Sequence, residues 1–201
     1  MSPHLERAQL LFQQSRTELA EGELRQALTA DPEDAYAHAL LGLCLSERER
    51  FDEATRETEQ AIHLAPFFSF AHYAHARVFF DRNRYPEALT AIAEAVRLDP
   101  QDANFFALLA NIHVQERRWQ PALEAAETGL QFNPEHVGCV NLRAIALVKL
   151  GRAAEAGITM DAALAKHPAS SLTHANQGWT LLHQGNAKAA AEHFREALRL
   201  D

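Results

Sequence analysis

The stretch AHALLGLCLSERERFDEATRETEQAIHLAP, residues 37–66, decides the fold of this chain. It predicts two helices, roughly over 36–48 and 51–64, joined by a short polar turn. Pro66 ends the second helix because its ring forces the preceding residue out of helical geometry. The stretch therefore predicts one helix hairpin.

The hairpin recurs along the whole chain. Five prolines are spaced by a constant 34 residues, which is typical of a repeat array. They are Pro32, Pro66, Pro100, Pro134 and Pro168. Small residues recur in the same frame, and they allow the two helices of a hairpin to approach closely. One such column is Ala20, Ala54, Ala88, Ala122, Ala156 and Ala190. The frame predicts one domain, 1–201, of six units: 1–34, 35–68, 69–102, 103–136, 137–170 and 171–201.

Turn and cap residues agree with this frame. Asn83, Gly151 and Gly185 lie between the two helices of their units, where a left-handed backbone is expected. Pro86 and Pro121 lie in the first turn of a second helix, where a missing amide hydrogen costs nothing. Four residues are predicted to cap the following helix. They are Asp34, Ser69, Asp102 and Ser170.

The quoted stretch resembles a tetratricopeptide repeat, and all six units fit that 34-residue pattern. Two columns depart from the family. The large residue at position 4 is a histidine in four units, and the aromatic residue at position 17 is absent from three. The resemblance implies an all-α fold, a right-handed α-solenoid of six stacked helix-turn-helix hairpins. It also implies a concave groove, lined by the first helices, that binds peptides or partner helices without catalysis or cofactors.

Bulk composition excludes several functions. The net charge of -8 argues against nucleic acid, which is bound by clustered Lys and Arg. No stretch approaches the ~18 apolar residues of a membrane helix, and the first residues lack a secretory signal. We therefore expect a cytoplasmic protein, with membrane contact only through a segment absent from this sequence. No glycine-rich phosphate loop, GxSxG or HExxH motif is present, so we do not expect an enzyme.

The segment FSFAHYAHARVFF, residues 68–80, is unusually rich in aromatic residues and histidines. Two of its histidines, His72 and His75, are spaced like metal ligands, and His38 lies at the equivalent place one unit earlier. Equivalent positions in adjacent repeats stand about 8–10 Å apart, too far to converge on one ion at ~2 Å. We therefore favour histidines that hydrogen-bond within the helix interfaces, and no metal site.

Other residues of this segment form a stripe on the groove side of the predicted helix. The stripe either covers the seams between repeats or binds a partner. An arginine among aromatic residues can hold a carboxylate, and side-chain amides farther along can pair with a peptide backbone. We favour binding of a protein or peptide partner. The predicted groove residues are Tyr36, Leu43, Phe70, Tyr73, Arg77, Phe80, Asn104, Asn111, Asn141, Asn176 and Trp179.

Arginines occupy position 16 in five units, so the edge formed by the turns within hairpins is basic. This ridge could contact anionic lipid or an acidic protein. Pairing with acids three residues later, such as Glu53 and Glu87, is the stronger interpretation.

The last predicted helix keeps an apolar face that should contact a seventh unit. Phe194, Leu198 and Leu200 form this face. Arrays normally need a polar terminal unit, so we expect either a fragment of a longer protein or burial of the face in a homo-oligomer. The alternative function is therefore a self-associating scaffold, or the soluble part of a longer membrane-associated protein.

Overall fold

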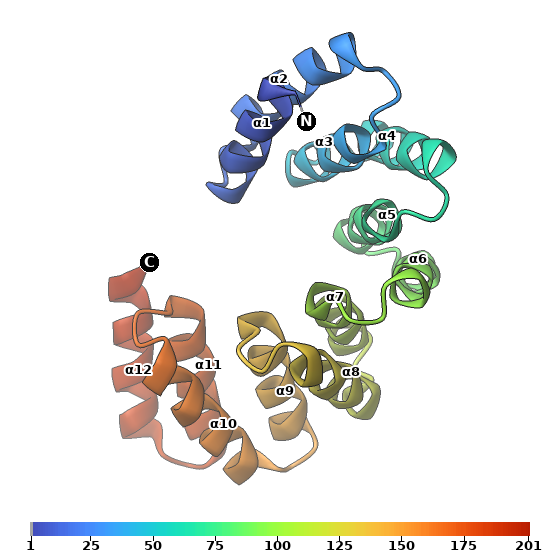
Figure 1. The fold of residues 1–201 in the computed structure, drawn as a ribbon. Helices are drawn as coiled ribbons and strands as arrows, with labels where there is room; N and C mark the ends of the chain where they lie inside the picture. Colours follow the sequence, from blue (N-terminus) through green and yellow to red (C-terminus); the bar gives the residue numbers. More distant parts are fainter. Residues whose placement is uncertain (1) are drawn as a thin grey trace. The chain divides into compact units, whose positions relative to one another are not determined.

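The computed structural model describes residues 2–201, which form twelve α-helices and no strand. The helices pair into six successive hairpins (Figure 1), which confirms the predicted all-helical fold. The bounds are α1 (Pro3–Gln13), α2 (Thr17–Ala30), α3 (Ala35–Glu47), α4 (Phe51–Leu64), α5 (Ser69–Asp81), α6 (Tyr85–Leu98), α7 (Ala103–Gln115), α8 (Trp119–Phe132), α9 (Val137–Lys149), α10 (Ala153–Lys166), α11 (Ser171–His183) and α12 (Ala187–Leu200). Within the described residues, no helix is long and apolar enough to cross a bilayer.

The turn inside each hairpin has one residue with positive φ. The predicted left-handed residues are confirmed, with φ of 59° at Asn83, 79° at Gly151 and 82° at Gly185. The other three hairpins place side-chain-bearing residues at the same position. They are Ser15, Glu49 and Arg117. The turn geometry is therefore kept even where the local residue does not favour it.

Three of the four predicted helix caps are confirmed. Asp34, Asp102 and Ser170 each accept a hydrogen bond from a backbone N–H in the following first turn, at 2.9, 2.8 and 3.2 Å. The prediction for Ser69 is wrong. Helix α5 begins at Ser69 itself, and the preceding residue Phe68 offers no side-chain cap.

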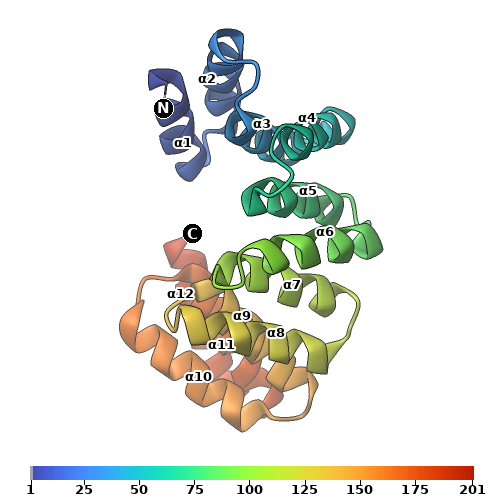
Figure 2. The same ribbon diagram turned by 45° about the vertical axis from the view of Figure 1, so that its right-hand side comes forward.

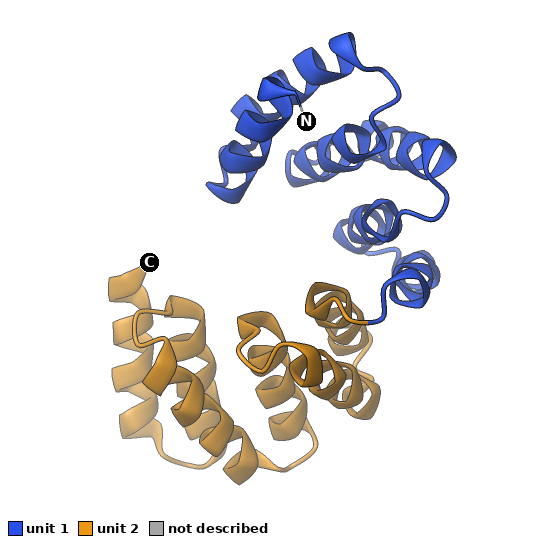
Figure 3. Ribbon diagram, in the orientation of Figure 1, with its two compact units in different colours: residues 1–100 blue, residues 101–201 orange. Residues whose placement is uncertain are grey.

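The chain contains two compact units, residues 1–100 and 101–201 (Figure 3). In the first, α3 contacts α1, α2, α4 and α5, so that every residue from 39 to 46 is buried. Gly42 permits the close approach of α3 to α4, because a Cβ there would lie 3.1 Å from the carbonyl oxygen of Ala54 and would collide with Thr58. The column of alanines packs in the same way, since Ala20, Ala54 and Ala88 are fully buried.

In the second unit, α9 is the central helix. It contacts α7, α8, α10 and α11, and it lies between α8 and α10 in both Figure 1 and Figure 2. The core of the second unit includes Leu147 of α9 and Met160 of α10, both fully buried. The buried residues of α9 are Cys139, Asn141, Ala144, Ala146, Leu147 and Val148.

Candidate functional site

The aromatic residues predicted on the first unit lie together. The rings of Tyr36 and Phe70 stack with centroids 5.1 Å apart and an interplanar angle of 26°, and Tyr73 lies 5.9 Å beyond Phe70. All three are half-buried, and Gln9 donates a hydrogen bond of 2.8 Å to the Tyr36 hydroxyl. This row crosses the contact between α3 and α5. It both covers the seam between two repeats and keeps part of each ring accessible.

Arg77 and Phe80 continue along α5. The Arg77 side chain is 42% exposed, and its Nε lies 2.9 Å from a carboxylate oxygen of Asp81. Phe80 is half-buried, with its ring centroid 6.0 Å from that of Tyr85. Arg77 thus has one acidic partner within its own helix and keeps an accessible edge of the guanidinium.

The prediction of Leu43 as a groove residue is wrong. Leu43 is only 6% exposed and belongs to the hydrophobic core of the first unit. The physical reason is that α3 is packed against helices on several sides, so the face assigned to the groove is covered.

The histidines of this region are engaged in hydrogen bonds. His75 Nδ1 lies 2.8 Å from the hydroxyl of Thr58, and burial lowers the pKa of His75 to about 4. His72 bonds to the carbonyl oxygen of Pro66 at 2.8 Å. His38 lies 2.6 Å from Glu57, whose hydrogen bond raises the pKa of His38. These contacts account for all three histidines as interface residues. Residues 2–201 contain no group of three or more His, Cys, Asp or Glu side chains placed to hold a metal ion.

Asn141 on α9 is the most unusual of the predicted groove residues. It is 3% exposed, and neither its amide nitrogen nor its amide oxygen has a hydrogen-bond partner among the described protein atoms. On the contacting helix α11, the amide nitrogen of Asn176 is likewise buried without a partner. The sequence predicts Asn141 on an accessible surface, and this is wrong because α7 and α11 pack against α9.

The other predicted residues of the second unit are more accessible. Asn104 is exposed, and its side chain bonds to Asp102 at 2.7 Å and to His136 at 3.1 Å. Asn111 is half-buried on α7. Trp179 is half-buried on α11, and the ammonium group of Lys149 lies 4.9 Å from its ring centroid. These residues lie on the first helices of their hairpins.

The apolar face of α12 is partly covered within the unit. Leu198 is 80% exposed and Phe194 is 36% exposed, whereas Leu200 is half-buried. The Phe194 ring packs over Gly178, where an added Cβ would lie 2.9 Å from the ring. Leu198 is therefore the most accessible of the three.

Three of the five arginines at position 16, Arg50, Arg84 and Arg152, pair as expected with acids three residues later. Arg50 with Glu53 and Arg84 with Glu87 form ion pairs of 2.5 and 2.6 Å. The basic ridge thus has internal partners at these positions.

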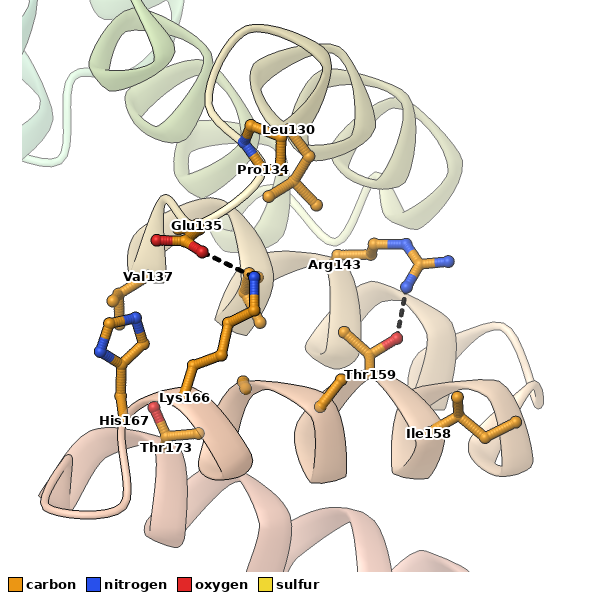
Figure 4. A pocket seen from close by; sticks show the side chains of 13 residues that line it. Leu130, Pro134, Glu135, Val137, Arg143, Ile158, Thr159, Lys166, His167 and Thr173 are labelled. Atoms are coloured by element: carbon orange, nitrogen blue, oxygen red, sulfur yellow. Dashed lines mark hydrogen bonds and ion pairs between the residues drawn. The ribbon is translucent and has the colours of Figure 1, made fainter.

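A pocket that sequence reasoning missed lies in the second unit. It has a volume of about 300 Å³ and is formed by α8, α9, α10 and the start of α11 (Figure 4). Apolar side chains contribute much of its lining. They include Leu130, Val137, Val140, Ile158 and Ala162. One feature of the sequence indicates this pocket. Ile158 is apolar, whereas the same repeat position carries Gly, Arg, Thr or Glu in the other five units.

Comparison with known proteins agrees with the hairpin architecture. The family model for the tetratricopeptide repeat matches residues 5–67, 73–137 and 141–201. No curated protein sequence matches the chain.

Solved structures similar to this chain include TTC0263, a thermophilic tetratricopeptide repeat protein of Thermus thermophilus. It has a TM-score of 0.80 and 16% identity, with 89% of this chain and 97% of that chain covered. PilF of Pseudomonas aeruginosa has a TM-score of 0.78 and 22% identity, with 98% and 90% covered. YrrB, described as a tetratricopeptide repeat protein with an unusual peptide-binding site, has a TM-score of 0.63 and 20% identity, with 89% and 92% covered.

These likenesses show the fold, and the family match extends over nearly all of the repeat frame derived above. Six hairpins in a 34-residue frame, each with a left-handed turn residue and buried small residues, account for that match. The chain belongs to the tetratricopeptide repeat family, whose members are generally non-catalytic scaffolds for protein interactions.

Proposed function

We propose that this protein is a non-catalytic module that binds a peptide or a partner helix on the first helices of its hairpins. The observation that carries the proposal is the half-buried row of Tyr36, Phe70 and Tyr73, continued by Arg77, on first helices of the first unit. In the second unit, the amides of Asn141 and Asn176 have buried atoms without a protein hydrogen-bond partner. Buried side-chain amides in folded proteins almost always have hydrogen-bond partners. A peptide backbone provides both the donors and the acceptors that these groups lack.

Contact with Asn141 requires a local rearrangement at α9. Because Asn141 is 3% exposed, its side chain must change rotamer, or α11 must shift, before a peptide can reach it. Such adjustments of side chains on binding are common. The cost of burying an unpaired amide, about 1–3 kcal/mol, favours the rearranged state when a partner is present.

The first unit supplies the accessible contact area. Half-buried aromatic rings of Tyr36, Phe70 and Tyr73, followed by Arg77, resemble the aromatic and arginine anchors that dominate binding energies at interfaces. YrrB is described as having an unusual peptide-binding site, which supports peptide binding as a function compatible with this fold.

Peptides selected by display against the wild-type chain provide the test. Fluorescence anisotropy should show that Tyr73→Ala or Arg77→Ala weakens binding about thirtyfold, as for truncation of an interface anchor. Phe67→Ala is the matched control, because Phe67 is 81% exposed and lies between helices α4 and α5. Unchanged affinity in both α5 variants, with helical content preserved, would show that the aromatic row only covers a seam.

Self-association is the second candidate function, and the exposure of Leu198 favours it. A large apolar side chain that is 80% exposed, next to the partly exposed Phe194, fits a contact with another copy. Sedimentation velocity over a range of concentrations would test this with the double variant Phe194→Gln and Leu198→Gln. A wild-type chain that stays monomeric at all concentrations would rule the candidate out.

A further inference from the structure

We propose that the pocket between α8 and α10 binds a small apolar carboxylate. This site is separate from the peptide-binding surface proposed above, because none of the predicted groove residues lines it, although α9 contributes to its wall. The inference therefore does not depend on the proposed peptide binding.

The pocket has the size and lining of a ligand site. Its volume of about 300 Å³ is at the low end of the range for small-molecule pockets. Leu130 of α8 and Val140 of α9 contribute apolar surface on one side, and Ile158 and Ala162 of α10 contribute it on the other. Ile158 is 72% exposed, an unusual state for a branched aliphatic side chain at the edge of a hollow. An apolar ligand would remove this surface from water.

The apolar character is specific to the fifth repeat. At the position of Ile158, the other repeats carry Gly22, Arg56, Thr90, Glu124 and Glu192. At the position of Ala162, they carry Gln26, Gln60, Glu94, Thr128 and Glu196. Because the repeat fold tolerates polar residues at both positions, folding alone does not require isoleucine and alanine there.

Charge at the mouth favours an anion. Arg143 and Lys166 line the pocket with a single carboxylate, that of Glu135, although the chain as a whole has a net charge of -8. Figure 4 shows these groups on opposite parts of the mouth, with Lys166 linked to Glu135 and Arg143 linked to Thr159. Each cation has an acidic partner, Glu127 for Arg143 and Glu135 for Lys166, so a ligand carboxylate would bind by replacing one of these partners.

Lys166 is the cation best able to change partner. Its ammonium group lies 2.7 Å from Glu135, and the two side chains are 55% and 59% exposed. Exposed ion pairs of this kind contribute little to stability, so a ligand can replace Glu135 at small cost. Arg143 is less exposed, at 27%, and is held by Glu127 at 3.2 Å as well as by Thr159. Arg143 therefore supplies a fixed positive charge beside the exchangeable one.

The experiment uses octanoate as the probe and the full chain with labelled Ile, Leu and Val methyl groups. Titration followed by methyl NMR should give saturable shifts at Ile158, Val137 and Val140. Octylammonium, which has the same tail and the opposite charge, should bind at least about fivefold more weakly than octanoate. Octanol has a hydrocarbon tail like that of octanoate and no charge. Its affinity therefore measures the contribution of the tail, and the difference from octanoate measures that of the carboxylate.

Two variants define the site. Ile158→Glu introduces the residue found at the same position in the fourth and sixth repeats, and it should abolish octanoate binding while the circular dichroism spectrum is retained. Lys166→Gln should weaken octanoate about fivefold and leave octanol unchanged. If Ile158→Glu does not fold, Ala162→Gln provides the same test with a residue found in the first two repeats.

Several results would overturn the proposal. They are the absence of saturable shifts at the pocket methyl groups, equal affinity for octanoate and octylammonium, or full octanoate affinity in a folded Ile158→Glu or Ala162→Gln variant. Binding of an acidic, apolar peptide at these methyl groups without any binding of octanoate would also overturn it, because the occupant would then be a protein segment.

Discussion

Replacing Asn141 by leucine should stabilise this protein, although most substitutions of buried residues destabilise. Asn141 is 3% exposed and neither amide atom has a protein hydrogen-bond partner, so no protein group offsets the cost of removing this amide from water. That cost is about 1–3 kcal/mol for a buried polar group left unpaired. Leucine has the same number of side-chain heavy atoms and no polar atom.

The magnitude follows from these terms. Removing the unpaired amide should raise the free energy of unfolding by about 1–3 kcal/mol. For a chain of this length, each kcal/mol corresponds to about 2–4 °C in the thermal midpoint. Circular dichroism at 222 nm, followed during heating and in urea, would measure both quantities. The same variant should lose affinity for displayed peptides, because the proposed function uses this amide.

Asn141→Asp is the matched control, since it keeps the side-chain shape and places an ionisable group in the same buried position. This variant should be less stable than the wild type, because an unpaired buried charge costs more than an unpaired amide. A leucine variant that is destabilised by more than about 1 kcal/mol would refute the reasoning, because it would mean that the amide has a hydrogen-bond partner such as an ordered water.

Three further predictions concern packing and pH. Gly42→Ala should destabilise by about 1–3 kcal/mol in urea unfolding because its Cβ collides with α4. Gly22→Ala, with no atom within 4 Å of the added Cβ, should be neutral or stabilising. Because burial lowers the folded-state pKa of His75 to about 4, the neutral ring stabilises the fold above pH 6.5, and this contribution should fall between pH 6.5 and 4. His75→Gln should flatten that part of the stability curve, and an unchanged curve would contradict the assignment. His193→Glu should raise the thermal midpoint at pH 6, because His193 now faces His174 at 3.0 Å between Nδ1 atoms and a carboxylate would pair better with it. An equal or lower midpoint would show that the two imidazoles already pair as well as histidine and glutamate.

The repeat, the hairpins and most of their boundaries can be predicted from the amino-acid pattern alone. These features depend on contacts within about 34 residues, so the residues of each unit predict its own hairpin. The same pattern occurs in all six units. The proline period, the buried alanine column and the left-handed residue of each turn are properties of this local pattern. The aromatic row of Tyr36, Phe70 and Tyr73 was also predictable, because its members lie at defined positions of adjacent repeats.

Which side of a helix remains accessible depends on the packing of neighbouring helices and is not predictable from the spacing within one helix. Helical spacing places Leu43 and Asn141 on the same stripe as Tyr73, yet neighbouring helices bury the first two and leave the third half-exposed. The pocket depends likewise on α8, α9 and α10 together, since no one of them forms it. The exposure of a side chain depends on how closely the flanking helices pack. That distance is set by side chains of the adjacent repeats, and the residue pattern of a single helix does not contain them.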